Sequence, residues 1–125
     1  MKSNVSCISY GGNERGIVKE GIVAIQKVLM GDNVDEKRSL LLALDWFMDP
    51  YYGQDVHIAN IRSDLVKLLQ TVVIWSNEEE VAEDALDLLS SYEWPPFEIL
   101  EKNLDRVSER LKPYVLEVIN MDKEE

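Results

Sequence analysis

The chain has 125 residues and a formal net charge of −11, from 24 acidic and 13 basic residues. This charge repels nucleic-acid phosphates and anionic lipid, so it disfavours direct binding to either and favours a basic protein partner. The single cysteine, Cys7, cannot form an intramolecular disulfide, and with His57 as the only histidine the sequence lacks the ligand set of a zinc site.

Residues 1–12 are expected to be a flexible lead-in, and the first helix follows them. Asn13 can cap a helix that runs to about Met30, where Gly31 supplies the stop. Apolar residues recur in this range at three- and four-residue spacing: Ile17, Ile22, Ile25, Val28 and Leu29. The pattern therefore predicts one helix over about 13–30.

The next two helices form the first predicted hairpin, over about 34–75. Asn33 and Glu36 have the spacing of a capping box, and Pro50 ends this second helix at about residue 48. The third helix ends in TVVIW at 71–75, which would indicate a strand if it stood alone. Its apolar residues favour a helix because they keep helical spacing: Ile58, Ile61, Leu65, Leu68, Leu69, Val72 and Val73.

A second hairpin is predicted over about 77–112. Asn77 and Glu80 repeat the capping-box spacing and open a fourth helix that ends near Tyr92. Pro96 suits the first turn of a fifth helix, whose apolar residues are Phe97, Leu100, Leu104, Val107 and Leu111. Pro113 must kink or break this helix, so residues 113–121 form a short sixth helix or a bent continuation, and 122–125 form a frayed tail.

An internal repeat relates the two hairpins. ALDWF at 43–47 and ALDLL at 85–89 are offset by 42 residues. The same offset superposes Leu65 on Val107, Leu69 on Leu111 and Val73 on Val115. Paired helices with a period of about 40 to 47 residues are typical of HEAT and armadillo repeats, so residues 34–118 resemble a short HEAT-like stack with the first helix as its cap. We expect one domain over 1–125 with an all-α fold of five to six helices in antiparallel hairpins; an irregular helical bundle is the alternative.

The fourth predicted helix carries a dense run of carboxylates. At about 100° per residue they fall in one sector and the apolar residues fall in the opposite one. No Lys or Arg occurs from 68 to 101, although a face that is only soluble is usually interleaved with opposite charges. The carboxylates of this acidic sector are Glu79, Glu80, Glu83, Asp84 and Asp87. They indicate either a solvated helix face or a contact surface for a basic protein.

The turns within the two predicted hairpins contain aromatic residues. The turn MDPYYGQD holds Tyr51 and Tyr52, and the turn SYEWPPFE holds Trp94 and Phe97. Such turns lie on one edge of a stack, so these side chains either anchor a partner or close the apolar ends of the hairpins. Trp46 and Trp75 lie inside predicted helices, where we expect them in the core.

The sequence contains no recognisable catalytic or metal-binding motif. His57 has no Ser or Cys at motif spacing, and YGGNERG at 10–16 lacks the Lys-Ser/Thr of a P-loop. The pair Glu79 and Glu83 has neither an EF-hand loop nor a histidine beside it. No run of about 18 apolar residues and no signal-peptide core is present. We therefore expect a cytoplasmic protein that is not an enzyme and has no cofactor and no metal.

In size, acidity, helical hairpins and lack of a catalytic constellation, the chain resembles the small helical or HEAT-like immunity proteins of bacterial polymorphic-toxin and contact-dependent inhibition systems. The resemblance is one of type. It implies a stoichiometric inhibitor that binds a cognate toxin domain, often a basic nuclease. On this interpretation the acidic sector steers association, and Tyr51, Tyr52, Trp94 and Phe97 anchor the complex. The alternatives are a HEAT-like adaptor that bridges two proteins and a homodimer that buries the aromatic edge on itself.

Overall fold

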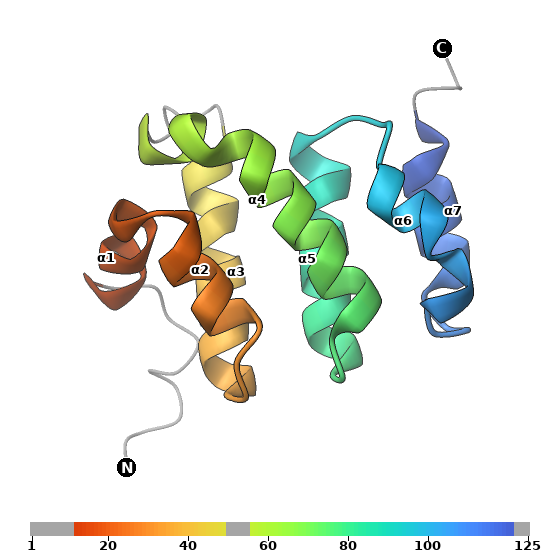
Figure 1. Cartoon of the computed structure of the whole chain (residues 1–125), viewed down its shortest axis with the longest axis horizontal. Coiled ribbons are helices and arrows are strands. Elements are labelled where there is room, and N and C mark those ends of the chain that lie inside the picture. The colour runs from red at the N-terminus through yellow and green to blue at the C-terminus, as the bar shows by residue number, and fades with distance from the viewer. Residues whose placement is uncertain (1–11, 50–55, 122–125) are drawn as a thin grey trace. The chain divides into compact units, whose positions relative to one another are not determined.

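The protein is all-α over the residues that the computed structural model describes, 12–49 and 56–121 (Figure 1). Those ranges contain seven α-helices, one short 3-10 helix and no strand, which confirms the predicted fold class. The chain divides into two compact units, Met1–Leu65 and Val66–Glu125, and the division falls inside α4, Val56–Trp75. The expectation of one domain over 1–125 stays a prediction.

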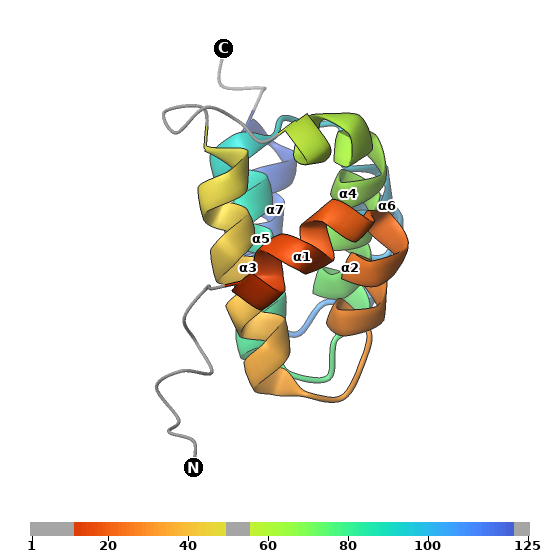
Figure 2. The same ribbon diagram turned by 90° about the vertical axis from the view of Figure 1, so that its left-hand side faces the viewer.

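The first unit contains α1 (Gly12–Glu20), α2 (Ile22–Leu29), α3 (Val34–Met48) and the first part of α4. α2 and α3 are in contact and run in opposite directions, and α1 contacts both (Figure 2). The prediction of one helix over 13–30 is wrong, because the chain breaks at Gly21. This glycine has a φ of 107°, in the left-handed region that favours glycine. Of the apolar residues predicted for this range, Ile25 and Leu29 are buried, and Ile17, Ile22 and Val28 are half-buried. Val18, before the break, is also buried.

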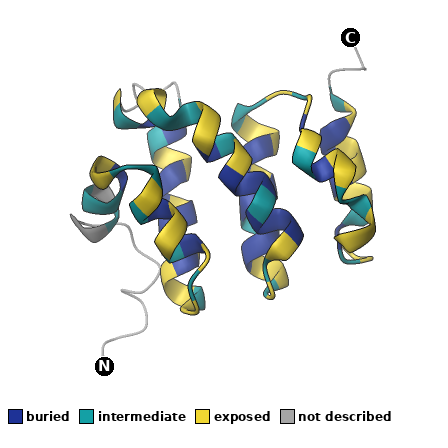
Figure 3. Cartoon of the chain, in the orientation of Figure 1, coloured by how far each residue is buried: buried dark blue, intermediate teal, exposed yellow. Residues whose placement is uncertain are grey.

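α3 begins and ends where the sequence predicts. The Asn33 side chain accepts a hydrogen bond from the Glu36 backbone N–H at 3.0 Å, which confirms Asn33 as the N-cap. The helix ends at Met48, two residues before Pro50. Its inner face supplies much of the apolar core of this unit: Leu40, Leu41, Ala43, Leu44 and Met48 (Figure 3).

The second unit contains the last part of α4, α5 (Glu79–Tyr92), α6 (Glu98–Lys102), the 3-10 helix η3 (Leu104–Arg106) and α7 (Lys112–Ile119). The TVVIW segment is helical, as predicted. The predicted cap at Asn77 is wrong, because α5 starts two residues later with Glu78 at the N-cap position. Instead, Ser76 shapes this turn: its hydroxyl oxygen accepts a hydrogen bond from the Glu78 N–H at 3.2 Å.

The fifth predicted helix is also interrupted. Pro96 precedes the first helical residue, α6 ends at Lys102, and α7 starts only at Lys112. The break therefore precedes Pro113, which lies in the first turn of α7. Four of the five apolar residues of the pattern are nevertheless buried, and Leu104 is half-buried: the buried ones are Phe97, Leu100, Val107 and Leu111. Helical spacing thus indicated most of the residues that enter the core, although the chain there is not one helix.

The 42-residue offset relates one continuous helix to an interrupted segment. It places α3 on α5, and it places α4 on the segment formed by α6, η3 and α7. That segment is joined to α4 through Gln70, whose side-chain Oε1 accepts hydrogen bonds from the N–H groups of Ile99 and Leu100 at 2.9 and 3.2 Å. The HEAT-like repeat stays a prediction.

Candidate partner-binding surface

α5 separates charge from apolar surface along its whole length. The apolar residues predicted for one side are all buried: Val81, Ala82, Ala85, Leu86, Leu88 and Leu89. On the other side Glu79, Glu80 and Asp87 are exposed, and Glu83 and Asp84 are half-buried. The acidic sector therefore lies at the surface of the second unit because its opposite face forms part of the core.

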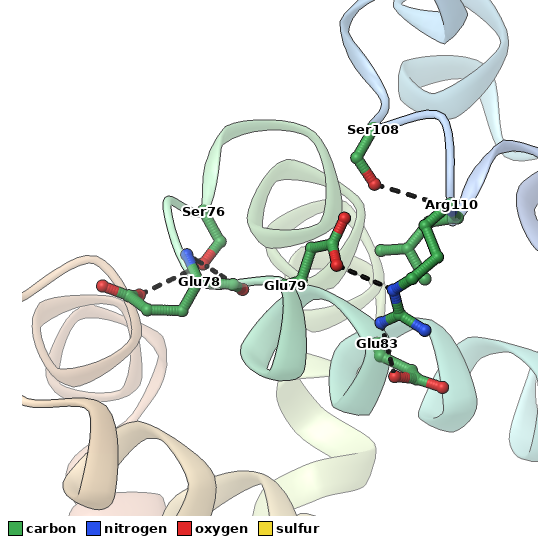
Figure 4. A network of polar contacts seen from close by, with 7 residues as sticks. Ser76, Glu78, Glu79, Glu83, Ser108 and Arg110 are labelled. Carbon is green, nitrogen blue, oxygen red and sulfur yellow. Dashed lines mark hydrogen bonds and ion pairs between the residues drawn. The ribbon is translucent and has the colours of Figure 1, made fainter.

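One edge of the acidic sector is paired with an arginine from a distant part of the chain (Figure 4). Arg110 lies in the turn before α7. Its Nε donates to Glu79 Oε1 at 2.7 Å, and its Nη2 donates to Glu83 Oε1 at 3.0 Å. The two glutamates are four residues apart, one turn of α5, so a single guanidinium bridges two carboxylates.

These contacts shift the pKa values of Glu79 and Arg110. The hydrogen bond from Arg110, followed by one from Ser108, lowers the pKa of Glu79 below its ordinary value. The hydrogen bonds to Glu79 and then Glu83 raise the pKa of Arg110. Both shifts favour the charged forms of Glu79 and Arg110. The side chains of Arg110, Glu79 and Glu83 are 54%, 44% and 32% exposed, so water and salt screen their attraction.

No local pattern in the sequence predicts this pairing. The absence of Lys and Arg from 68 to 101 describes one stretch of the chain, whereas Arg110 reaches α5 across 27 to 31 residues. The acidic sector thus has two parts. Arg110 holds Glu79 and Glu83, while Glu80, Asp84 and Asp87 form a second stripe at spacings of four and three residues.

The two described residues among the predicted aromatic anchors, Trp94 and Phe97, differ in their exposure to solvent. Trp94 is 65% exposed in the turn between α5 and α6, as an anchor should be. Phe97 is fully buried and has the core role that the sequence left open, so it does not offer a surface to a partner. Tyr51 and Tyr52 lie outside the described residues. Of the two described candidates, Trp94 is thus at the surface and Phe97 is in the core.

Trp94 and the first acids of α5 lie at opposite ends of that helix. α5 has 14 residues, and at about 1.5 Å per residue it is roughly 20 Å long. The candidate surface is therefore an extended strip along α5. It begins at Glu79, passes Asp87 and ends at the turn that carries Trp94.

The other two tryptophans were expected in the core, and this prediction is wrong. Trp46 is 40% exposed and Trp75 is 46% exposed. The guanidinium carbon of Arg106 lies 5.7 Å from the centroid of the Trp75 ring, which is cation–π distance. Large amphipathic rings often bury one part and leave another in water, so apolar spacing alone overestimates their burial.

No group of three or more His, Cys, Asp or Glu side chains is placed to hold a metal ion among the residues that the structure describes. In the same ranges, no helix has both the length and the apolar character needed to cross a bilayer. The chain shows no match to any protein-family model, to any curated protein or to any solved structure.

Proposed function

We propose that the chain is an immunity protein that binds a basic toxin domain in a one-to-one complex and neutralises it by occupying its surface. The observation that carries the binding part is the uneven charge of the two units. Val66–Glu125 has fifteen acidic and six basic residues, a formal net charge of −9, whereas Met1–Leu65 has nine and seven, a net charge of −2. A basic partner is therefore drawn to the second unit.

The strip along α5 supplies the two kinds of contact that such a complex uses. Exposed carboxylates such as Glu80 and Asp87 steer a basic partner and raise its association rate. The exposed indole of Trp94 can enter an apolar pocket, as interface hot spots do. A standard interface covers about 800 Å² on each partner, roughly 30 Å across, so one partner can cover the whole strip. The toxin part of the proposal is supported by the resemblance in size, acidity and helical content.

A charge-reversal experiment tests the surface. The triple variant Glu80→Lys, Asp84→Lys, Asp87→Lys changes the second stripe, and the matched control Glu20→Lys, Asp32→Lys, Asp64→Lys changes three exposed acids of the first unit. Both variants shift the net charge by the same amount, so a nonspecific charge effect acts on both equally.

The readout is affinity capture from native lysate, washed at low and high salt, followed by association kinetics with the protein that is recovered. We expect the unaltered chain to recover one basic toxin domain at close to one to one. The α5 variant should associate with this domain more slowly and with a flatter salt dependence. The control should bind it almost normally. The thermal midpoint should change little in either. A folded α5 variant with unaltered kinetics would exclude this surface, and a recovered partner without toxin activity would exclude the immunity function.

An adaptor is the second candidate, and one observation in the first unit favours it. Leu42 and Trp46 are both exposed and lie one turn apart on α3, so they form a second apolar contact point. An adaptor should recover two different proteins, one of them sensitive to Trp46→Ala and the other to the α5 reversal. Recovery of this chain alone would favour the homodimer.

A further inference from the structure

We propose that Arg110 is an internal competitor of the partner: in the free protein it holds the carboxylate pair, Glu79 and Glu83, that an arginine of the basic partner takes in the complex. This inference rests on the proposed function, because it needs a basic protein that docks on α5. It adds the chemical identity of one contact and an autoinhibitory ion pair that the partner must open.

The geometry points to arginine as the group that this pair accepts. Two donors on one edge of the Arg110 guanidinium, Nε and Nη2, each reach a different carboxylate, at 2.7 and 3.0 Å. The planar guanidinium presents its donors in a fixed fork, whereas a lysine ammonium is a point charge on a flexible stem. A partner arginine can therefore reproduce both bonds, and a lysine reproduces them less well.

The contact is also built to open. The side chains of Arg110, Glu79 and Glu83 are 54%, 44% and 32% exposed. Ion pairs this exposed contribute little net free energy to folding. The backbone that carries Arg110 is fixed independently of the ion pair. Val107 and Leu111 on either side of it are buried, and the Leu111 N–H donates to the Ser108 hydroxyl oxygen at 3.3 Å. The arginine side chain can thus leave α5 by rotation, without unfolding of the turn.

Arg106 provides a matched control in the same unit. It is an exposed arginine four residues earlier, and it lies over the Trp75 ring rather than on the glutamate pair. Replacing either arginine by glutamine removes one positive charge and makes the second unit equally more acidic. Only Arg110→Gln also removes the guanidinium from Glu79 and Glu83, so the difference between the two variants isolates the competition.

The test measures binding of octa-arginine and octa-lysine peptides to the full chain by calorimetry at low salt. We expect Arg110→Gln to bind octa-arginine about two- to fivefold more tightly than Arg106→Gln does, the range that corresponds to loss of an exposed ion pair. The gain should be smaller with octa-lysine. It should vanish when Glu79→Gln and Glu83→Gln are added. If Arg110→Gln does not fold, Arg110→Lys compared with Arg106→Lys should show the same order.

The possible failures are distinguishable. Equal affinities of Arg110→Gln and Arg106→Gln for octa-arginine would overturn the competition and leave the acidic surface intact. The same holds for a gain that persists in the Glu79→Gln, Glu83→Gln background. Absence of peptide binding by every folded variant would overturn both the competition and the proposed basic partner.

Discussion

Replacing Gln70 by methionine should destabilise the second unit, because it removes the side-chain oxygen that caps α6. α6 has five residues, and its N-cap residue, Phe97, offers no side-chain hydrogen bond. Gln70, only 4% exposed, supplies the missing acceptor from α4. Its Oε1 accepts from the N–H groups of Ile99 and Leu100, and its Nε2 donates to the Val66 carbonyl at 3.3 Å. Methionine has a similar volume and shape but no comparable acceptor.

The magnitude follows from the burial of the two N–H groups. The bond to Leu100 is buried, so leaving that donor unsatisfied costs about 1–3 kcal/mol. The bond to Ile99 is half-buried, and water can replace part of it, so its loss costs about 0.5–1.5 kcal/mol. We therefore expect Gln70→Met to lower the free energy of unfolding by roughly 2–4 kcal/mol, a large part of the 5–15 kcal/mol typical of a folded domain.

Urea denaturation followed by circular dichroism measures this loss, and amide hydrogen exchange locates it. Exchange at Ile99 and Leu100 should accelerate most in Gln70→Met. Thr71→Ala is the control, since its hydroxyl donates to the Lys67 carbonyl at an exposed position of the same helix. A Gln70→Met protein within about 0.5 kcal/mol of the unaltered chain, with both amides still protected, would refute the capping role.

Three further predictions concern local features. Asn33→Ala should lower the free energy of unfolding by about 0.5–2 kcal/mol because the Asn33 side chain caps α3. Asn77→Ala should change it by less than about 0.5 kcal/mol because Asn77 caps no helix, and urea titration of the two variants measures the difference. Gly21→Ala should cost about 1–3 kcal/mol because of its positive φ, while Gly16→Ala, inside α1 with open space around it, should be neutral or stabilising, as thermal melts would show. The pKa of Glu79 is lowered on folding, so its contribution to stability is present above the ordinary pKa of 4.5 and is lost as the pH falls through the folded value. Glu79→Gln should therefore be less stable than the unaltered chain at pH 7, and the difference should shrink as the pH falls below 4.5; a difference that does not change with pH would contradict the ion-pair explanation.

The apolar pattern predicted burial better than it predicted helix continuity. Ile25 and Leu29 keep the helical spacing set by the residues before Gly21, and both are buried although the helix breaks between them and Val18. Spacing reports which side of a segment faces the core, and it is insensitive to a single residue with unusual backbone angles. The isolated Gly21 was the available signal for that break. The break after Lys102 has no such signal, because no glycine or proline lies between Asn103 and Leu111.

The candidate surface was predicted only as far as local chemistry reaches. Composition and helical angle placed the acids of α5 on one side, because both properties belong to the helix itself. The pairing of Arg110 with Glu79 and Glu83 depends on how the turn before α7 packs, which no local pattern encodes. The burial of Phe97 and the exposure of Trp94, three residues apart, likewise depend on the path of one turn.

The ion pairs of Arg110 with Glu79 and Glu83 argue against solubility as the only role of the acidic sector. If the carboxylates of α5 served solubility alone, the fold would gain from compensating them, and Arg110 shows that compensation from a distant segment is possible. Yet the second unit keeps a formal net charge of −9, at a cost in self-repulsion, and it also exposes Trp94 in the turn that follows α5. Solubility favours the charge but opposes an exposed indole. A surface that steers a basic partner and then anchors it accounts for both features, because steering needs the charge and anchoring needs the ring.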